Sequence, residues 1–322
     1  MATEQIITGH WFAIVNPIAG AGHGLTDYPQ IAKLLRDNDI YHDAVFTEHK
    51  FHATELTVEA IDKGYRKIIV IGGDGTLNEV VNGLFIQQIC QPKDIQLAVI
   101  AVGTGNDWVR SFGIASCYSE AIRAIKEGKT FLQDVGAVTY TESKFTQTRY
   151  MANVAGLGFD SFVISIFNHW KTKGFKGKWL YLASILKAYF QYKSAGMVVE
   201  LDGKQIFNNL LFSIAVGICK FNGGGVQQLP KAVADDGLLD ITLIRPVHWW
   251  HIVFRLSKLF NGGIYSIGHV QYAQGKHIRI TSVPPVMLEC DGELMGETPI
   301  DIEVIPQAVR VVVTKEFLAS QK

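Results

Sequence analysis

The strongest constraint on the fold is a glycine-rich turn that follows an apolar run in the first third of the chain. The run "KIIVIGG", residues 67–73, is rich in β-branched residues, and "TLNEVVNGLF", residues 76–85, has a helical pattern. Apolar strands that alternate with helices are typical of a parallel sheet covered on both faces. The first third of the chain keeps this alternation, so the sequence predicts a parallel, Rossmann-like α/β domain at the N-terminus.

The alternation of strands and helices ends at about Gly136, and strand-like runs then follow one another. Such a succession is typical of an antiparallel β-sandwich or barrel. Two helical patterns interrupt it, near residues 179–192 and 248–260. We therefore expect an α/β domain over residues 1–134 and a β-rich domain over residues 135–306. The last segment, 307–322, could return to either domain and is assigned to the first.

The expected elements of the two domains follow directly from these patterns. In the first domain the strands are 10–17, 41–48, 67–73 and 95–103, and the helices are 27–40, 52–65, 76–85 and 119–129. In the second domain the strands are 135–141, 148–158, 197–204, 209–219, 238–246, 276–283, 285–292 and 298–306.

The charges are balanced overall but are segregated along the chain. The formal net charge is zero, with 30 basic and 30 acidic residues, which argues against a nucleic-acid binder. Residues 161–199 contain six Lys and no acid, and residues 241–288 contain five Lys or Arg and no acid. This segregation indicates a locally basic surface, unless these side chains lie on unrelated faces.

The cysteines and the N-terminus indicate a cytoplasmic protein. Cys90, Cys117, Cys219 and Cys290 are far apart and form no C-x-x-C pair, which fits a reducing compartment. The N-terminus has no pattern of a signal peptide, and no apolar run reaches the roughly 18 residues of a membrane span.

Three glycine-rich turns follow strands of the first domain, at the sheet edge where ligands collect. They are Asn16–Gly24, Gly72–Glu79 and Val102–Arg110. Backbone amides in such turns can face an anion, although tight strand–helix connections also use glycine for steric reasons. Three turns in succession favour a nucleotide site. Neither a P-loop nor a classical dinucleotide motif is present.

The motifs carry a resemblance to a known family. "GGDGTLNEVVNGL", with "NPIAG" upstream and "GTGND" downstream, resembles the catalytic domain of the diacylglycerol kinase family, which includes bacterial lipid kinases, sphingosine kinases and ceramide kinases. The GGDGT signature also occurs in NAD kinases. The Asn-Asp of "GTGND", the later "DDGLLD" and the late "DGE…TP" favour the lipid branch, and the motifs together span Asn16 to Pro299.

The resemblance implies an NAD kinase-like α/β domain and an antiparallel β-sandwich domain, with ATP held between them. Thr47 would touch the nucleotide, although a strand-end or capping role is the alternative from the residues alone. The residues that the resemblance assigns to ATP are Asn16, Pro17, Gly20, Thr47, Gly72, Gly73, Asp74, Gly75, Thr76, Asn78, Glu79, Gly103, Thr104, Asn106 and Asp107.

Asp74 is unusual because it puts a carboxylate inside a phosphate-binding turn. Two carboxylates that face a polyphosphate would repel it unless Mg²⁺ lies between them. The resemblance implies that Asp74 helps to organise Mg²⁺ and water, with Asp107 beside it. The alternative is that Asp74 caps the helix that it precedes.

A second Mg²⁺ site is implied by "KAVADDGLLDI", residues 231–241. By resemblance, Asp236 would bind a structural Mg²⁺ with the carbonyls of Val233 and Leu238, and Asp134 would connect to it through water. Without the family, Asp-Asp-Gly is ordinary turn chemistry.

The turn "DGE", residues 291–293, provides the candidate catalytic base. By resemblance, Asp291 accepts the proton of the lipid hydroxyl, and Glu293 is its partner in the site. A plain hairpin turn is the alternative, since Asp-Gly favours one.

Two segments combine aromatic residues with basic ones. In residues 167–193, Trp, Phe and Tyr alternate with six Lys, and residues 248–260 are similar. This composition suits an anionic membrane surface, although two ordinary helices would give the same pattern. His248 and His251 lie within the second segment, but no further ligands are near them, so no zinc site is expected.

The sequence therefore predicts an ATP- and Mg²⁺-dependent lipid kinase that phosphorylates a hydroxyl of a lipid such as diacylglycerol. Its catalytic residues would be Asp291, Glu293 and Asp74. The expected partners are the lipid substrate and a membrane surface with which a cytoplasmic protein associates peripherally, and not nucleic acid; a homodimer is left open. The alternatives are a soluble NAD kinase-like enzyme and a silent nucleotide- or lipid-binding regulator.

Overall fold

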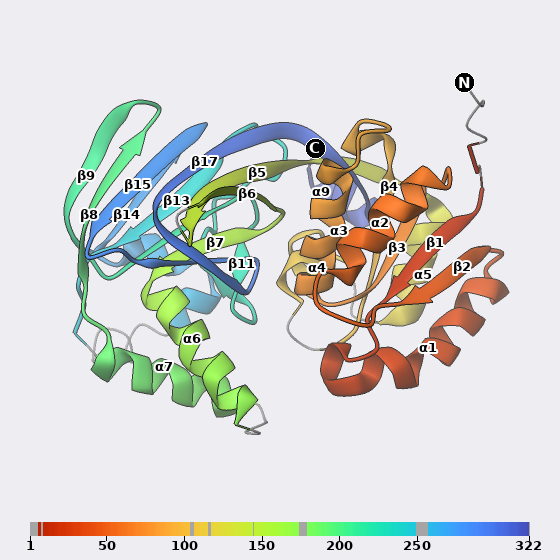
Figure 1. Ribbon diagram of the computed structural model, residues 1–322, viewed down its shortest axis with the longest axis horizontal. Helices are drawn as coiled ribbons and strands as arrows, with labels where there is room; N and C mark the ends of the chain where they lie inside the picture. The colour runs from red at the N-terminus through yellow and green to blue at the C-terminus, as the bar shows by residue number, and fades with distance from the viewer. Residues whose placement is uncertain are drawn as a thin grey trace. The chain divides into compact units, whose positions relative to one another are not determined.

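The computed structural model in Figure 1 divides the chain into two compact units. Unit 1 comprises Met1–Val135 with Pro306–Lys322, and unit 2 comprises Gly136–Ile305. The structure describes residues 6–7, 9–103, 106–114, 117–143, 145–173, 179–248 and 257–321.

A parallel sheet forms the centre of unit 1. Its strands are β1 (Trp11–Val15), β2 (His42–Phe46), β3 (Lys67–Gly72), β4 (Gln96–Ala101) and the end of β17 (Glu293–Val312), in the order β17–β4–β3–β1–β2. Each neighbouring pair in this order is parallel. The strands β1, β3 and β4 are almost entirely buried, as near-continuous apolar runs require. The predicted parallel α/β domain is confirmed.

The helices of unit 1 are of two lengths. The longer ones are α1 (Ala19–Asp37), α2 (His52–Asp62), α3 (Asp74–Ile86) and α5 (Tyr118–Glu127), and the short ones are η1 (Pro92–Asp94), α4 (Asp107–Ser111) and α9 (Lys315–Ser320). In Figure 1, α2 lies beside α3, and α1 packs against α5. The range of α1 begins earlier than predicted, but Gly20, Ala21 and Gly22 have positive φ and are not helical, so a kink separates the first residues from the regular helix.

Unit 2 is built from antiparallel strands, which confirms the predicted β-rich class. One path of paired strands is β14–β13–β10–β7–β16–β17, and a second is β9–β8–β15–β17, with β5 and β6 paired beyond β17. The strands are β5 (Thr130–Glu142), β6 (Phe145–Met151), β7 (Val154–Gly158), β8 (Ala195–Leu201), β9 (Lys204–Leu211), β10 (Ser213–Gly217), β11 (Phe221–Asn222), β12 (Val226–Gln227), β13 (Leu239–Ile244), β14 (Val270–Gly275), β15 (His277–Val283) and β16 (Met287–Cys290).

Several strand boundaries differ from the prediction. The expected strand 148–158 is divided by a turn at Ala152 and Asn153, and the expected strand 209–219 is divided at Phe212. The sequence did not predict β14, because "VQYAQG" has neither a continuous apolar run nor a clean alternation. The last segment returns to unit 1, where Arg310 and Val311 pair with β4.

Two helices pack against each other in unit 2, as Figure 1 shows. They are α6 (Phe159–Thr172) and α7 (Trp179–Gln191), and the second confirms the predicted helix near 179–192. Phe159 stacks on Phe212 with ring centroids 4.4 Å apart, and Tyr192 closes the same apolar cluster. Residues 249–256 of the other expected helix lie outside the described residues.

In the part of the chain that the structure describes, no helix is both long and apolar enough to cross a bilayer.

Replacement of Gly83 by Ala tests the packing of α2 on α3. A Cβ at Gly83 would lie 2.6 Å from Thr57 Cβ and 2.8 Å from the Thr54 carbonyl oxygen. Gly→Ala inside a helix ordinarily stabilises by about 1 kcal/mol, but overpacking costs about 1–3 kcal/mol. We expect Gly83→Ala to lower the free energy of unfolding in urea, whereas Gly268→Ala, where a Cβ meets nothing within 4 Å, does not lower it. A more stable Gly83→Ala protein would contradict this packing.

Candidate active site

The first glycine-rich turn is tied to the second by a side-chain hydrogen bond. Asn16 Nδ2 donates to Thr76 Oγ1 at 2.9 Å, while Asn16 Oδ1 accepts from the backbone amide of Ile18 at 3.1 Å. The chain then passes close to itself, because a Cβ at Gly24 would lie 1.9 Å from the Asn16 carbonyl oxygen. Only glycine fits at position 24, so the sequence fixes the shape of this turn.

Asp74 ties the second turn to the third. Its carboxylate accepts hydrogen bonds from the backbone amides of Asp107 at 2.9 Å and Trp108 at 3.2 Å. These amides belong to the first turn of α4, so Asp74 caps a different helix from its own. The N-cap of α3 is Gly73, which has no side chain to make a capping hydrogen bond. Asp74 is the first residue of α3, one position after that N-cap.

The first and third turns meet backbone to backbone. A Cβ on Gly20 would lie 3.1 Å from Gly103 Cα, and both glycines have positive φ. Asn106 Nδ2 donates to the Gly103 carbonyl at 3.2 Å. Asn106 also lies close to the second turn, because a Cβ on Gly73 would lie 3.1 Å from Asn106 Oδ1. Each of the three turns thus contacts the other two. Thr104, assigned to ATP in the sequence, lies outside the described residues.

Some residues that the resemblance assigns to ATP also have structural contacts. Glu79 accepts from the amides of Phe51 and Ala53 at 3.0 and 3.1 Å, and so caps α2. Asn78 is buried and accepts from Asn82 Nδ2. The Thr47 amide donates to the Val15 carbonyl and continues the pairing of β1 with β2. Asp107 is buried beside Arg110, with 3.7 Å between carboxylate and guanidinium.

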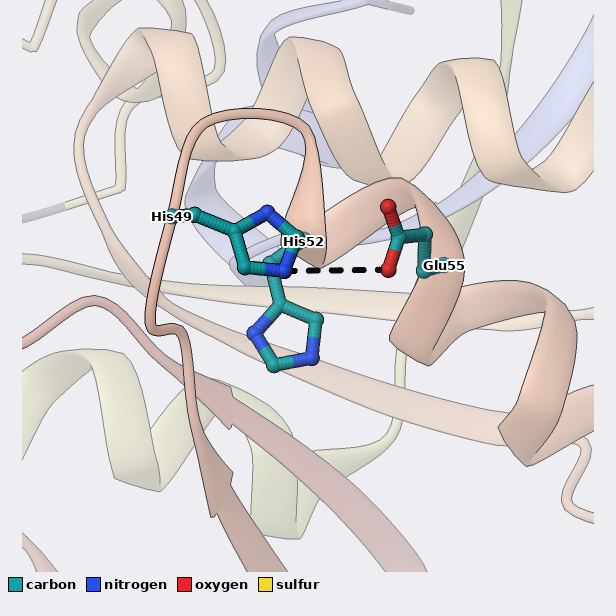
Figure 2. Close-up of side chains that lie close together, drawn as sticks. All are labelled: His49, His52 and Glu55. Atoms are coloured by element: carbon teal, nitrogen blue, oxygen red, sulfur yellow. Dashed lines mark ion pairs between the residues drawn. The ribbon is translucent and has the colours of Figure 1, made fainter.

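Among the described residues, three side chains that could bind a metal lie together at the start of α2: His49 just before the helix, and His52 and Glu55 in its first turn (Figure 2). His49 Nδ1 donates to the Lys50 carbonyl, and its Nε2 lies 3.9 Å from Glu55 Oε2, with which a protonated ring forms an ion pair. His52 Nδ1 accepts from the Glu48 amide at 2.9 Å, so the neutral ring of His52 carries its proton on Nε2. The two rings are stacked at 4.4 Å. A cation would have to break the Glu48 hydrogen bond, so this group is not a preformed metal site.

In unit 2, Asp291 and Gly292 form the turn between β16 and β17. Both have positive φ, 49° and 86°, as a two-residue hairpin of this kind requires. The Asp291 carboxylate accepts from the amides of Ala152, Asn153 and Val154 at 2.8, 3.0 and 3.0 Å. The candidate base therefore also holds the turn between β6 and β7 in place. Glu293 follows, with its carboxylate 3.7 Å from the Arg149 guanidinium.

The buried carboxyl of Glu289 lies two residues before Asp291. Its Oε2 accepts from the Gly292 amide at 2.9 Å and its Oε1 from Asn222 Nδ2 at 3.1 Å. Burial, the largest cause, together with the neighbouring Asp160 and Asp291 charges, raises the pKa of Glu289 to about 8, while the hydrogen bonds from Asn222 and Gly292 lower it. Sequence reasoning missed Glu289, because the alternation of Leu288 and Cys290 places it on the opposite face of β16, with the exposed Met287.

The residues around Asp236 fit a divalent cation. Asp236 Oδ1 accepts from the Leu238 amide at 3.0 Å, and Gln274 Nε2 donates to Asp236 Oδ2 at 3.2 Å and to Asp240 Oδ2 at 3.4 Å. Asp240 is fully buried, and its Oδ1 has no hydrogen-bond partner among the described residues. Burial, the largest cause, and the Asp236 charge raise the pKa of Asp240 to about 6, while the Tyr272 hydroxyl and Gln274 lower it. Two facing carboxyls, one with an unsatisfied oxygen, are the donor set that Mg²⁺ prefers.

The other predicted metal contacts stay predictions. Val233 is partly exposed, and Asp134, in unit 1, is buried with its Oδ1 accepting from the Gln307 amide at 2.7 Å. Sequence reasoning missed Asp240, because it placed Asp240 in an apolar strand and gave it no role. A carboxylate inside such a strand was the available signal.

An apolar cavity lies in unit 2 beside α6. Phe159, Phe212, Ile244 and Val247 contribute to its wall, and Asp160 is one of its few polar groups. The polar part of its lining is small, as a site for a hydrocarbon chain requires. Burial raises the pKa of Asp160 to about 6, while Gln228 and Ser213 lower it by hydrogen bonding.

Two family models match the chain. The model of the diacylglycerol kinase catalytic domain matches residues 10–138, and the model described as "YegS C-terminal NAD kinase beta sandwich-like domain" matches residues 153–313. The first range lies almost entirely in unit 1, and the second lies mostly in unit 2 and ends in the last segment of unit 1.

Curated relatives and solved structures agree with these models. The diacylglycerol kinases of Staphylococcus carnosus and Mycobacterium tuberculosis are each 26% identical to this chain. The match covers 94% of both chains for the first and 93% of both chains for the second. A crystal structure of a diacylglycerol kinase from Bacillus anthracis has a TM-score of 0.72 at 23% identity, with 96% of this chain and 98% of that chain covered. An NAD kinase from Archaeoglobus fulgidus has a TM-score of 0.50 at 11% identity, with 96% of each chain covered, and shows the fold alone.

These matches define a kinase with an NAD kinase-like fold. The chain belongs to the diacylglycerol kinase catalytic-domain family, and the resemblance seen in its motifs is confirmed.

Removal of the Asp291 carboxylate tests its structural role. Asp291→Ala leaves three backbone amides without their acceptor, and each such loss costs about 1–3 kcal/mol. We expect the free energy of unfolding to fall by at least about 2 kcal/mol, and by less in Asp291→Asn, which keeps one oxygen. Asp235→Ala removes a turn carboxylate with no such contacts and serves as the control. Equal stability of Asp291→Ala and the wild type would contradict the geometry.

Proposed function

We propose that this protein is an ATP- and Mg²⁺-dependent lipid kinase that phosphorylates a hydroxyl of a lipid such as diacylglycerol at a membrane surface. The observation that carries the proposal is the mutual contact of the three glycine-rich turns in unit 1, in a chain of the diacylglycerol kinase family. The names of the relatives support diacylglycerol as a substrate.

The nucleotide would be bound by backbone amides of these turns. The helix α3 begins directly after Gly73, so its first amides are available to an anion, and the helix dipole favours a phosphate there. Asp74 would act mainly as a positioning group, because its two oxygens hold the start of α4. Mg²⁺ would supply charge neutralisation for the phosphates when bound.

The acceptor hydroxyl would be positioned at the Asp291–Gly292 turn. A loose phosphoryl-transfer transition state depends more on positioning and charge stabilisation than on strong proton abstraction. A carboxylate that already accepts three amides can meet this demand, since its task is to orient the hydroxyl and receive the proton late. Glu293, partly exposed beside Arg149, would complete this side of the site.

Unit 2 would bind the hydrocarbon chain of the lipid and contact the bilayer surface. The apolar cavity beside α6 suits a hydrocarbon chain. On α7, Leu186 and Phe190 are 55% and 78% exposed, and their spacing puts them on one face of the helix. Lys187 lies 5.0 Å over the Trp170 ring, so aromatic and basic groups occur together here. Such a surface can enter the lipid headgroup region, with Lys contacting anionic lipids.

A phosphoryl-transfer assay tests the activity. Purified protein receives labelled ATP, Mg²⁺ and vesicles that contain diacylglycerol, with NAD added in a parallel reaction. We expect label in the lipid, and a loss of at least about 100-fold in Asp291→Asn with ATP affinity retained, as removal of a base or positioning group at the reacting centre produces. Asp37→Asn, an exposed carboxylate in unit 1, should leave the rate unchanged.

Label in NAD and not in lipid would replace the proposal by the NAD kinase-like alternative. ATP binding without transfer to any acceptor would instead support the silent regulator.

Replacement of the exposed apolar pair on α7 tests the membrane surface. Leu186→Glu with Phe190→Glu puts two charges where burial in the headgroup region is expected, and we expect at least a tenfold loss of binding to anionic vesicles in a sedimentation assay. Leu210→Glu with Phe145→Glu, at exposed positions on β9 and β6, adds the same charge and is the matched control. Equal loss in both proteins would contradict a specific role of α7.

A further inference from the structure

Glu289 holds the Asp291–Gly292 turn from the inside. It lies on β16, is 1% exposed and accepts the Gly292 amide at 2.9 Å. Asp291, in the same turn, holds the 152–154 backbone with its own carboxylate. The turn that carries the candidate base is therefore fixed by two carboxyl groups that point to different neighbours.

A chain of amide hydrogen bonds connects Glu289 to the wall of the apolar cavity. Asn222 Nδ2 donates both to Glu289 Oε1 at 3.1 Å and to Gln228 Oε1 at 3.2 Å. Gln228 Nε2 in turn donates to Asp160 Oδ2 at 2.9 Å. The Gly223 amide donates to Asn222 Oδ1 at 2.9 Å and so fixes which way the Asn222 amide faces. The network therefore has a defined direction, with both amides donating to carboxyl groups.

Asp160 and Glu289 face the same small space. A Cβ on Gly156 would lie 3.1 Å from Asp160 Cβ and 3.1 Å from Glu289 Oε1, so glycine at this position leaves room for both. The described contacts of the two carboxyls are amides and the Ser213 hydroxyl, and include no Lys or Arg. Two uncompensated negative charges in such a site are costly, and the Asp291 carboxylate adds to the repulsion.

We propose that Glu289 is a positioning residue that stays protonated during catalysis, and that Asp160 and Glu289 form a carboxyl pair with one negative charge that holds the Asp291–Gly292 turn. Glu289 does not touch the substrate, since it is buried beneath the turn. The proposal rests on the proposed function, because the turn is the place where the acceptor hydroxyl would be positioned.

Ionisation of Glu289 would put a second charge into the pair and loosen the turn. The groups that face it are Asp160 of α6, Asn222 of β11, and Asp291 and Gly292 of its own hairpin. Burial, the largest cause, and the two nearby carboxylates raise its pKa to about 8. The folded pKa of Glu289 exceeds the unfolded value of 4.5, so the contribution of Glu289 to stability is fully present below pH 4.5 and is lost as the pH rises through about 8.

The activity test compares pH profiles of kcat. The wild type and Glu289→Gln, which is neutral at every pH, are assayed between pH 6 and 9.5 with saturating ATP and lipid. Glu297→Gln, an exposed carboxyl on the same hairpin, is the control. We expect wild type and control to lose kcat above about pH 8, with at least a threefold larger loss by pH 9.5 than Glu289→Gln shows. An identical alkaline loss in all three proteins would overturn the proposal.

A stability measurement tests the same pair without any activity. The melting temperature of the wild type should fall more steeply between pH 6 and 9 than that of Glu289→Gln. Asp160→Asn should move the midpoint of the wild-type fall to lower pH, because the like charge that opposes ionisation is gone. Equal slopes in the wild type and both variants would overturn the proposal. If no lipid is phosphorylated but these shifts appear, the proposed function fails while the carboxyl pair stands.

Discussion

The three glycine-rich turns of unit 1 lock one another, and the nucleotide site depends on this arrangement. Asn16 joins the first turn to the second, Asp74 joins the second to the third, and the close approach of Gly20 and Gly103 joins the third to the first. Because each link is short and specific, the amides that would face phosphate are fixed before any ligand arrives. Such preorganisation reduces the ordering cost of binding.

Two carboxyl groups of unit 2, those of Asp291 and Glu289, accept the backbone hydrogen bonds that hold the candidate catalytic turn and its neighbour. Asp291 orders the 152–154 backbone, and Glu289 orders the turn in which Asp291 lies. A catalytic turn built in this way couples its geometry to the protonation of buried acids, because a lost hydrogen bond there cannot be replaced by water. Loss of activity on mutation of Asp291 therefore does not by itself identify it as a base, and only a comparison with stability separates the two roles.

Much of the fold could be predicted because its signals are local. Continuous apolar runs such as residues 67–73 gave the parallel strands, and the Asp-Gly pair at 291–292 correctly indicated a hairpin turn. The division at Ala152 and Asn153 was missed, since it depends on a carboxylate that is 138 residues away from Asn153 in the chain. The partners of Asp74 and the pairing of Asp160 with Glu289 are likewise tertiary, so no sequence spacing reveals them.

The central claim is that Mg²⁺-ATP binds to the three linked turns of unit 1. Hydrogen–deuterium exchange of the whole protein, with and without Mg²⁺-ATP, tests it most directly. The account predicts slower exchange in peptides that cover residues 16–24, 72–79 and 102–110 together, since the turns contact one another. ATP binding that leaves the exchange of all three peptides unchanged would contradict it.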